Sequence, residues 1–96
     1  MKTIRKVEED LWHVTSESGD QRRYDYFVYQ SSGGGYYHFM PREGSFKYPQ
    51  RLNDHRCLAI EKHEDNYARV AEEYDCNPWT LKECVRTVIE LQKIKR

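Results

Sequence analysis

The first half of the chain alternates apolar and polar residues with a period of two, which is typical of β-strands. Residues 11–15 place Trp and Val on one side and His and Thr on the other. Residues 23–30 contain a run rich in Tyr, Phe and Val, which favour extended structure, and residues 36–40 form a similar segment. We predict an antiparallel three-stranded meander over residues 11–40, with residues 3–7 as an additional edge strand.

The second half of the chain follows a helical period instead. Asn77 is a suitable N-cap, and Pro78 suits the first helical position because its missing N–H would have no partner there. Apolar residues then recur at helical spacing, at Leu81, Cys84, Val85, Val88, Ile89, Leu91 and Ile94. This pattern predicts a helix over residues 78–93.

An earlier helical stretch starts near residue 52, with Asn53 or Asp54 as its cap. Its apolar residues at helical spacing are Ile60, Tyr67, Val70, Ala71 and Tyr74. Residues 75–77 form a short break, so two helices should meet there in a tight corner. The sequence therefore predicts an α+β fold.

We expect a single domain over residues 1–96, because a chain of this length supports one small core. Residues 1–40 would form the meander, residues 41–51 a loop, and residues 52–96 a part with two or three helices. Eight tyrosines and an aromatic content of 14% indicate a folded chain, since disordered chains are poor in aromatic residues.

The residues around the corner resemble the helix-turn-helix of DNA-binding proteins over residues 67–87. The matching apolar positions are Val70, Ala71, Tyr74, Cys76, Leu81 and Cys84. Asp75 stands where the motif usually has glycine, and aspartate adopts a positive φ more readily than most residues. The resemblance implies that nucleic acid contacts the second helix and the basic tail, at Asn77, Trp79, Thr80, Lys82, Glu83, Arg86, Lys93, Lys95 and Arg96. The alternative is an ordinary helical corner whose apolar residues are core.

Charge argues against strong binding of nucleic acid by this corner. Formal net charge is zero, and residues 58–90 contain four basic residues against eight acidic ones. Affinity for nucleic acid depends mainly on cations that meet phosphates. A second basic and aromatic stretch contains Arg42, Phe46, Lys47, Tyr48, Arg51 and Arg56. Such side chains stack on bases and hold phosphates, although the sequence favours a solvated loop whose aromatic residues pack on the sheet.

A second likeness concerns residues 11–60, which resemble a degenerate SWIM-type zinc finger. His38 and Met40 stand at two of its cysteine positions, Asn53 stands at a third, and His55 alone keeps its type. Zinc prefers thiolate and imidazole ligands, so this set is a poor zinc site. His55, Cys57 and His63 form a separate small cluster without a recognisable spacing. We expect no metal and no cofactor.

The sequence contains no P-loop, nucleophile elbow, zinc-protease helix or dinucleotide fingerprint. We therefore expect a small non-catalytic regulatory protein that contacts nucleic acid through the corner, as a homodimer or within a complex. The alternative is a protein-binding inhibitor or adaptor that uses a Tyr-rich sheet face or an acidic helix that mimics nucleic-acid charge. The residues expected for that alternative are Tyr24, Tyr26, Tyr29, Tyr36, Tyr37, Glu72 and Glu73.

Two features bear on the compartment. No apolar run reaches the roughly 18–20 residues that a transmembrane helix needs. Three cysteines without a disulfide-framework spacing suit a reducing environment. We expect a cytoplasmic protein that does not associate with membranes.

Overall fold

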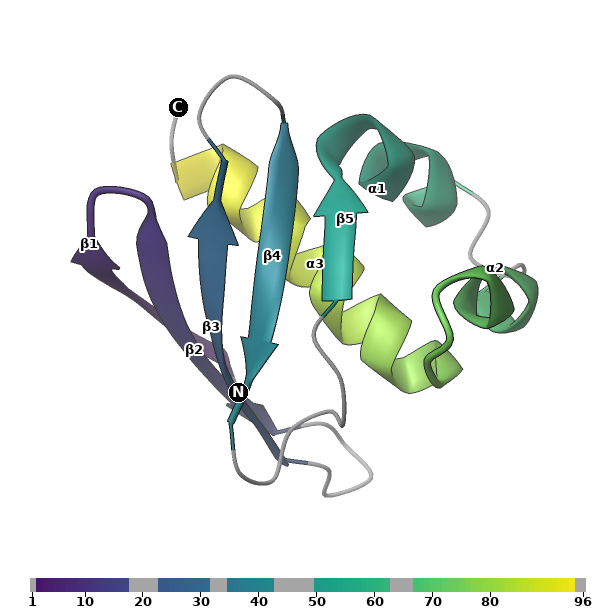
Figure 1. Cartoon of the computed structure of the whole chain (residues 1–96), viewed down its shortest axis with the longest axis horizontal. Coiled ribbons are helices and arrows are strands. Elements are labelled where there is room, and N and C mark those ends of the chain that lie inside the picture. Colours follow the sequence, from purple (N-terminus) through teal and green to yellow (C-terminus); the bar gives the residue numbers. More distant parts are fainter. Residues whose placement is uncertain (1, 18–22, 32–34, 43–49, 63–66, 95–96) are drawn as a thin grey trace. The chain divides into compact units, whose positions relative to one another are not determined.

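The computed structural model describes residues 2–17, 23–31, 35–42, 50–62 and 67–94. In this part of the chain a five-stranded sheet precedes three helices, which confirms the predicted α+β class (Figure 1). The strands are β1 (Lys2–Glu8), β2 (Leu11–Glu17), β3 (Arg23–Gln30), β4 (Tyr36–Pro41) and β5 (Gln50–Asn53). The helices are α1 (Asp54–Glu61), α2 (Tyr67–Glu73) and α3 (Pro78–Ile94).

The chain divides into two compact units, Met1–Arg51 and Leu52–Arg96. The boundary lies inside β5 and coincides with the start of the predicted helical part at residue 52. The expectation that the chain forms one domain stays a prediction. Most of the predicted loop, residues 43–49, lies outside the described residues.

The strands of the sheet lie side by side in the order of the sequence, from β1 to β5. β2 and β3 pair antiparallel with Val14 opposite Tyr26, and β3 and β4 pair antiparallel with Val28 opposite Phe39. Residues directly opposite each other point to the same face of a sheet. The predicted meander is confirmed, and the additional edge strand is confirmed as β1.

One face of the sheet is buried over β2, β3 and β4. Its members are Trp12, Val14, Ser16, Tyr24, Tyr26, Val28, Tyr37 and Phe39. Val14, Tyr26, Val28 and Phe39 have no exposed surface. Every second residue of each strand belongs to this face, which is the physical basis of the period-two pattern in the sequence.

The edge strand β1 is charged and mostly exposed. It pairs antiparallel with β2, with Lys2 opposite Ser16 and Lys6 opposite Trp12. The register shifts between Lys6 and Glu8, as in a β-bulge. The Lys6 ammonium lies 5.8 Å from the centre of the Trp12 ring.

In the helical unit, α1 begins at Asp54, slightly after the predicted start near residue 52, and its cap is one of the two predicted residues. Asn53 Oδ1 accepts hydrogen bonds from the backbone N–H groups of His55 and Arg56, at 2.9 and 3.4 Å. These bonds satisfy orphan donors of the first turn, so Asn53 is the N-cap. Cys57 is completely buried, and burial, with a smaller effect of the Asp54 carboxylate, raises the pKa of its thiol to about 12.

The corner between α2 and α3 ends α2 in a Schellman motif. The Cys76 N–H donates to the Ala71 carbonyl at 3.1 Å, and the Asp75 N–H donates to the Glu72 carbonyl at 3.2 Å. Asp75 has φ 52°, the left-handed conformation that glycine usually supplies at this point. This finding confirms that aspartate serves as the turn residue of the corner.

Helix α3 spans Pro78–Ile94, close to the predicted 78–93, and both α1 and α2 pack on it. Its buried residues are Thr80, Leu81, Cys84, Val85, Thr87, Val88 and Leu91. This arc is wider than a single apolar stripe because Thr80, Cys84, Thr87 and Leu91 form a second row beside the first. The Thr87 hydroxyl donates to the Glu83 carbonyl at 2.9 Å, so this buried polar group is satisfied within its own helix.

Strand β5 was not predicted. The sequence predicts a loop over residues 41–51 and a helix from near residue 52, whereas Gln50–Asn53 is extended and α1 starts at Asp54. Four residues are too few to show a clear alternation. No helix in the described ranges combines the length and the apolar character that a membrane crossing requires.

Candidate binding surface on the sheet

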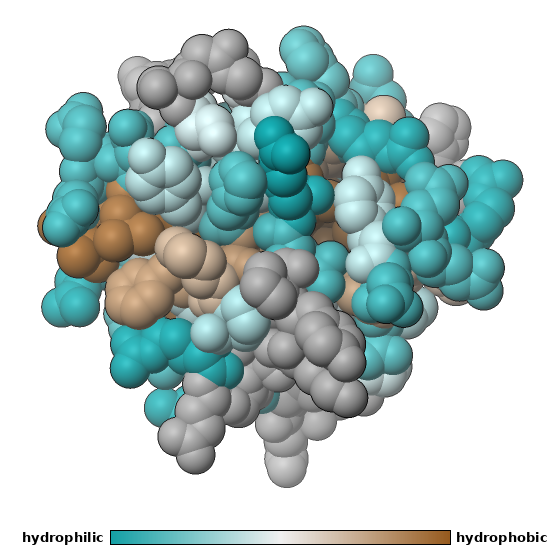
Figure 2. Space-filling model, viewed as in Figure 1, coloured by the Kyte–Doolittle hydropathy of each residue, from teal (hydrophilic) through white to brown (hydrophobic). Residues whose placement is uncertain are grey.

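The other face of the sheet, here called the open face, carries a row of partly exposed aromatic residues. The register places the following residues on it: Leu11, His13, Thr15, Asp25, Phe27, Tyr29, Tyr36, His38 and Met40. Tyr29, Tyr36 and Met40 are 47%, 36% and 39% exposed, so this face presents three large side chains to solvent. Figure 2 shows apolar residues gathered over the β1–β3 side of this face, with hydrophilic residues around them.

Four side chains, from β2, from β3 and from the residue that follows β4, form a connected cluster. His13 Nε2 lies 2.8 Å from Asp25 Oδ1, and the His13 and Phe27 ring centres are 5.1 Å apart. The Arg42 guanidinium lies 5.3 Å from the centre of the Phe27 ring, with its Nε 3.9 Å from Asp25 Oδ1. The Arg42 backbone N–H also donates to the Asp25 carbonyl at 3.0 Å, which holds the start of the Arg42 side chain beside β3.

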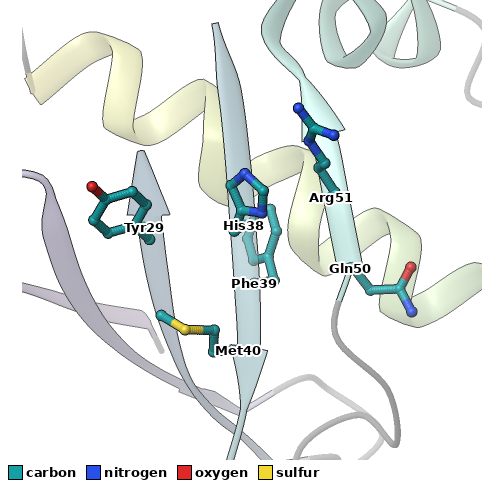
Figure 3. A pocket seen from close by; sticks show the side chains of 6 residues that line it. All are labelled: Tyr29, His38, Phe39, Met40, Gln50 and Arg51. Carbon is teal, nitrogen blue, oxygen red and sulfur yellow. The ribbon is translucent and has the colours of Figure 1, made fainter. Parts of the chain in front are cut away.

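A hollow of about 420 Å³ opens on the same face, lined by Tyr29, His38, Phe39, Met40, Gln50 and Arg51. These residues come from β3, β4 and β5. His38 stands on the near side of β4, between Tyr29 and Arg51, while Phe39 points to the opposite side (Figure 3). The volume lies in the range of about 300–1,000 Å³ that is typical of small-molecule sites.

Ring and guanidinium contacts fix the walls of the hollow. The Arg51 guanidinium lies 4.0 Å from the centre of the Tyr36 ring. The Tyr29 and His38 rings meet edge to face with their centres 6.5 Å apart, and Ser31 Oγ lies 3.5 Å from His38 Nε2. Aromatic faces and a stacked guanidinium are therefore presented together, in a geometry that accepts a planar group and an anion.

The tyrosines expected at a protein-binding face separate onto two faces, and this corrects the sequence analysis. Tyr24, Tyr26 and Tyr37 are 4%, 0% and 2% exposed and belong to the buried face. Tyr29 and Tyr36 alone of the five reach solvent. The reason is the pleat, since residues an odd number of positions apart along a strand point to opposite faces.

The helical corner presents most, but not all, of the expected residues. Asn77, Trp79 and Arg86 are exposed, and Lys82 and Glu83 are half-buried. Thr80 is only 4% exposed, so its side chain is not on the accessible surface, contrary to expectation. It lies in the second buried row of α3, one turn before Cys84.

The remaining expected residues of the helical unit are partly described. Lys93 is exposed, whereas Lys95 and Arg96 lie outside the described residues. Glu72 and Glu73 are exposed on α2, and Arg56 of α1 forms an ion pair with Glu73. The surface that adjoins the corner is therefore acidic, which disfavours phosphate.

The positions compared with zinc ligands have other surroundings. His38 and Met40 lie on the open face, Asn53 caps α1, and His55 is exposed. Among the described residues no group of three or more His, Cys, Asp or Glu side chains has the arrangement of a metal site. His63 lies outside the described residues.

Sequence reasoning singled out Arg42 and Arg51 but assigned them to a loop, and it did not identify Phe27, His38 and Met40 as surface partners. The signal was present in the strands. In β3 the positions 25, 27 and 29 alternate with the buried Tyr24, Tyr26 and Val28, so they had to share the open face. Comparisons with protein-family models, with curated proteins and with solved structures found no match to this chain.

Proposed function

We propose that this chain is a small non-catalytic regulatory protein that binds single-stranded nucleic acid on the open face of its sheet. The observation that carries the proposal is the position of two guanidiniums over aromatic rings of one sheet face, Arg42 at 5.3 Å from the Phe27 ring centre and Arg51 at 4.0 Å from the Tyr36 ring centre. Proteins that bind single strands combine aromatic platforms for the bases with cations that follow the backbone.

The charges of this part of the sheet suit a polyanion. In the described residues from β3 to β5 the charged groups are Arg23, Asp25, Arg42 and Arg51, three cations and one anion. The Asp25 carboxylate is already engaged by His13 and Arg42. A phosphate that approaches Arg51 therefore meets no uncompensated carboxylate among these residues.

A second candidate is duplex binding by the helical corner. It is favoured by the left-handed Asp75, which allows α3 to start directly after α2, and by the exposure of Trp79 and Arg86. The acidic side chains of α2, Glu72 and Glu73, act against it. We rank it second for this reason, and protein binding by Tyr29 and Tyr36 third.

Fluorescence anisotropy with labelled single-stranded and duplex oligonucleotides at low salt tests the proposal. We expect the single strand to bind more tightly, with an affinity that falls as salt rises, because phosphate contacts release counterions. The double variant Arg42→Gln/Arg51→Gln should lose most of the binding, and the matched double variant Lys82→Gln/Arg86→Gln should retain it.

The reverse pattern would refute the proposal. Wild type would then prefer duplex, and only the Lys82→Gln/Arg86→Gln variant would lose binding. This result would establish the helical corner as the nucleic-acid-binding site. Absence of binding to every oligonucleotide at low salt would remove nucleic acid as the partner and direct attention to a protein partner of Tyr29 and Tyr36.

A further inference from the structure

We propose that the hollow between β3, β4 and β5 is a single-nucleotide site, in which a base stacks on Tyr29 next to the His38 ring and the adjoining phosphate binds Arg51. This inference rests on the proposed function and identifies the part of the open face that binds the base. The hollow lies entirely within the unit Met1–Arg51, so all its lining residues belong to one compact unit.

The walls of the hollow have the shape and chemistry that a base requires. Tyr29 is nearly half exposed at 47%, so much of its ring is accessible to a stacked partner. His38 adds a second ring, and Met40 adds a thioether, which makes favourable contacts with aromatic groups. Every base has a π-face, so such a site accepts bases with little sequence preference.

The anion-binding part is Arg51. Its guanidinium is stacked on Tyr36 at 4.0 Å and, in Figure 3, stands beside His38 at the rim of the hollow. A guanidinium presents its N–H donors in a planar fork, which matches two oxygens of a phosphate.

The combination favours a nucleotide over other ligands of similar size. An uncharged aromatic ligand would make no use of Arg51, and a lone anion would make no use of the Tyr29 and His38 rings. An aromatic side chain beside a carboxylate in an acidic peptide has related chemistry. We favour the nucleotide because a strand supplies a ring and an anion at every unit, which matches the repeated pairing of ring and guanidinium on this face.

The test compares a labelled oligothymidylate with an oligomer of the same length whose sugars lack bases. Three proteins are measured: wild type, Tyr29→Ala and Arg51→Gln. Both residues are exposed, so both variants should fold, which circular dichroism verifies. Leu58→Ala and Arg69→Gln, at exposed residues of the helical unit that belong to neither candidate surface, serve as matched controls.

We expect Tyr29→Ala to weaken oligothymidylate binding about five- to hundredfold, the loss of one stacked base, and to leave binding of the base-free oligomer unchanged. Arg51→Gln should weaken binding of both oligomers. It should also reduce the slope of log affinity against log salt by about 0.7, the value for one phosphate contact on a single strand. The two control variants should bind like wild type.

Two outcomes separate failure of this site from failure of the proposed function. If wild type binds the oligothymidylate but Tyr29→Ala and Arg51→Gln lose no more than the controls, the hollow is not the nucleotide site although the function stands. If wild type binds neither oligomer at low salt, both proposals fall. Binding of an acidic aromatic peptide in place of the oligomers, lost in the same two variants, would assign the hollow to a protein ligand.

Discussion

The guanidinium of Arg51 lies 4.0 Å from the centre of the Tyr36 ring, and this contact joins β5 to the start of β4 across the open face. Both residues are exposed, with Tyr36 at 36%. The contact is made on the surface of the folded chain, so its strength can be measured without disturbing the core.

A double-mutant cycle on this pair should give a coupling of about 0.5–1 kcal/mol, the usual value of an exposed cation–π contact. The variants are Arg51→Gln, Tyr36→Leu and their combination, each measured by urea unfolding. Strictly additive effects of the two substitutions would mean that the stacked geometry is not maintained in solution.

Tyr26 and Tyr29 lie three residues apart on β3 and provide a matched test of the two faces. Tyr26 has no exposed surface, so Tyr26→Ala should cost about 3–5 kcal/mol of stability, as for other large aromatic residues in a core. Tyr29→Ala should cost less than about 1 kcal/mol, because nearly half of Tyr29 is already exposed to solvent. Chemical unfolding monitored by circular dichroism measures both, and similar losses would contradict the assignment of the faces.

Asp75 should be replaceable by glycine with a gain in stability. Its φ of 52° costs an ordinary residue roughly 1–2 kcal/mol, and glycine avoids most of this cost. We expect Asp75→Gly to raise the free energy of unfolding by up to about 1 kcal/mol and Asp75→Val to lower it. If valine were tolerated as well as glycine, the Schellman motif could not be the conformation of the corner in solution.

Cys57 should make stability depend on alkaline pH. Burial raises the pKa of its thiol from 9.0 to about 12, so the unfolded chain releases this proton at lower pH than the folded chain. The stabilisation is complete below pH 9 and is lost between pH 9 and 12, at no more than about 1.4 kcal/mol per pH unit.

The matched variant for this pH effect is Cys57→Ala, which keeps a small apolar side chain and removes the titrating group. Unfolding free energies of the two proteins should converge as pH rises from 9 to 12, after allowance for the constant cost of the substitution. Parallel pH profiles would show that the Cys57 thiol ionises equally in the folded and unfolded chains.

The fold was largely predictable because its local signals agree with its long-range contacts. The alternation in residues 11–15, 23–30 and 36–40 reports burial of one sheet face, and the N-cap at Asn53 marks the start of α1. β5 was not predicted because its position depends on pairing with β4, and a strand of four residues is too short to show a clear alternation of apolar and polar side chains.

The candidate surface was less predictable, because the type of a residue does not show on which face of a strand or helix its side chain lies. Grouping tyrosines together combined the core residues Tyr24 and Tyr26 with the exposed Tyr29, although their spacing already separates them. The helix-turn-helix resemblance predicts Thr80 on the outside of α3, yet it lies four residues before Cys84 in a buried row. The stacking of Arg51 on Tyr36 depends on β5 and could not be anticipated.

The irregular, charged first strand has a consequence for self-association. β1 lies at the end of the sheet, and an edge strand offers unpaired backbone groups to any extended chain that approaches it. Here the approaching chain would meet lysine and arginine side chains and a shift of register near Lys6. The β1 edge therefore resists the addition of a further strand, which is the step by which sheets of separate molecules join into fibrils.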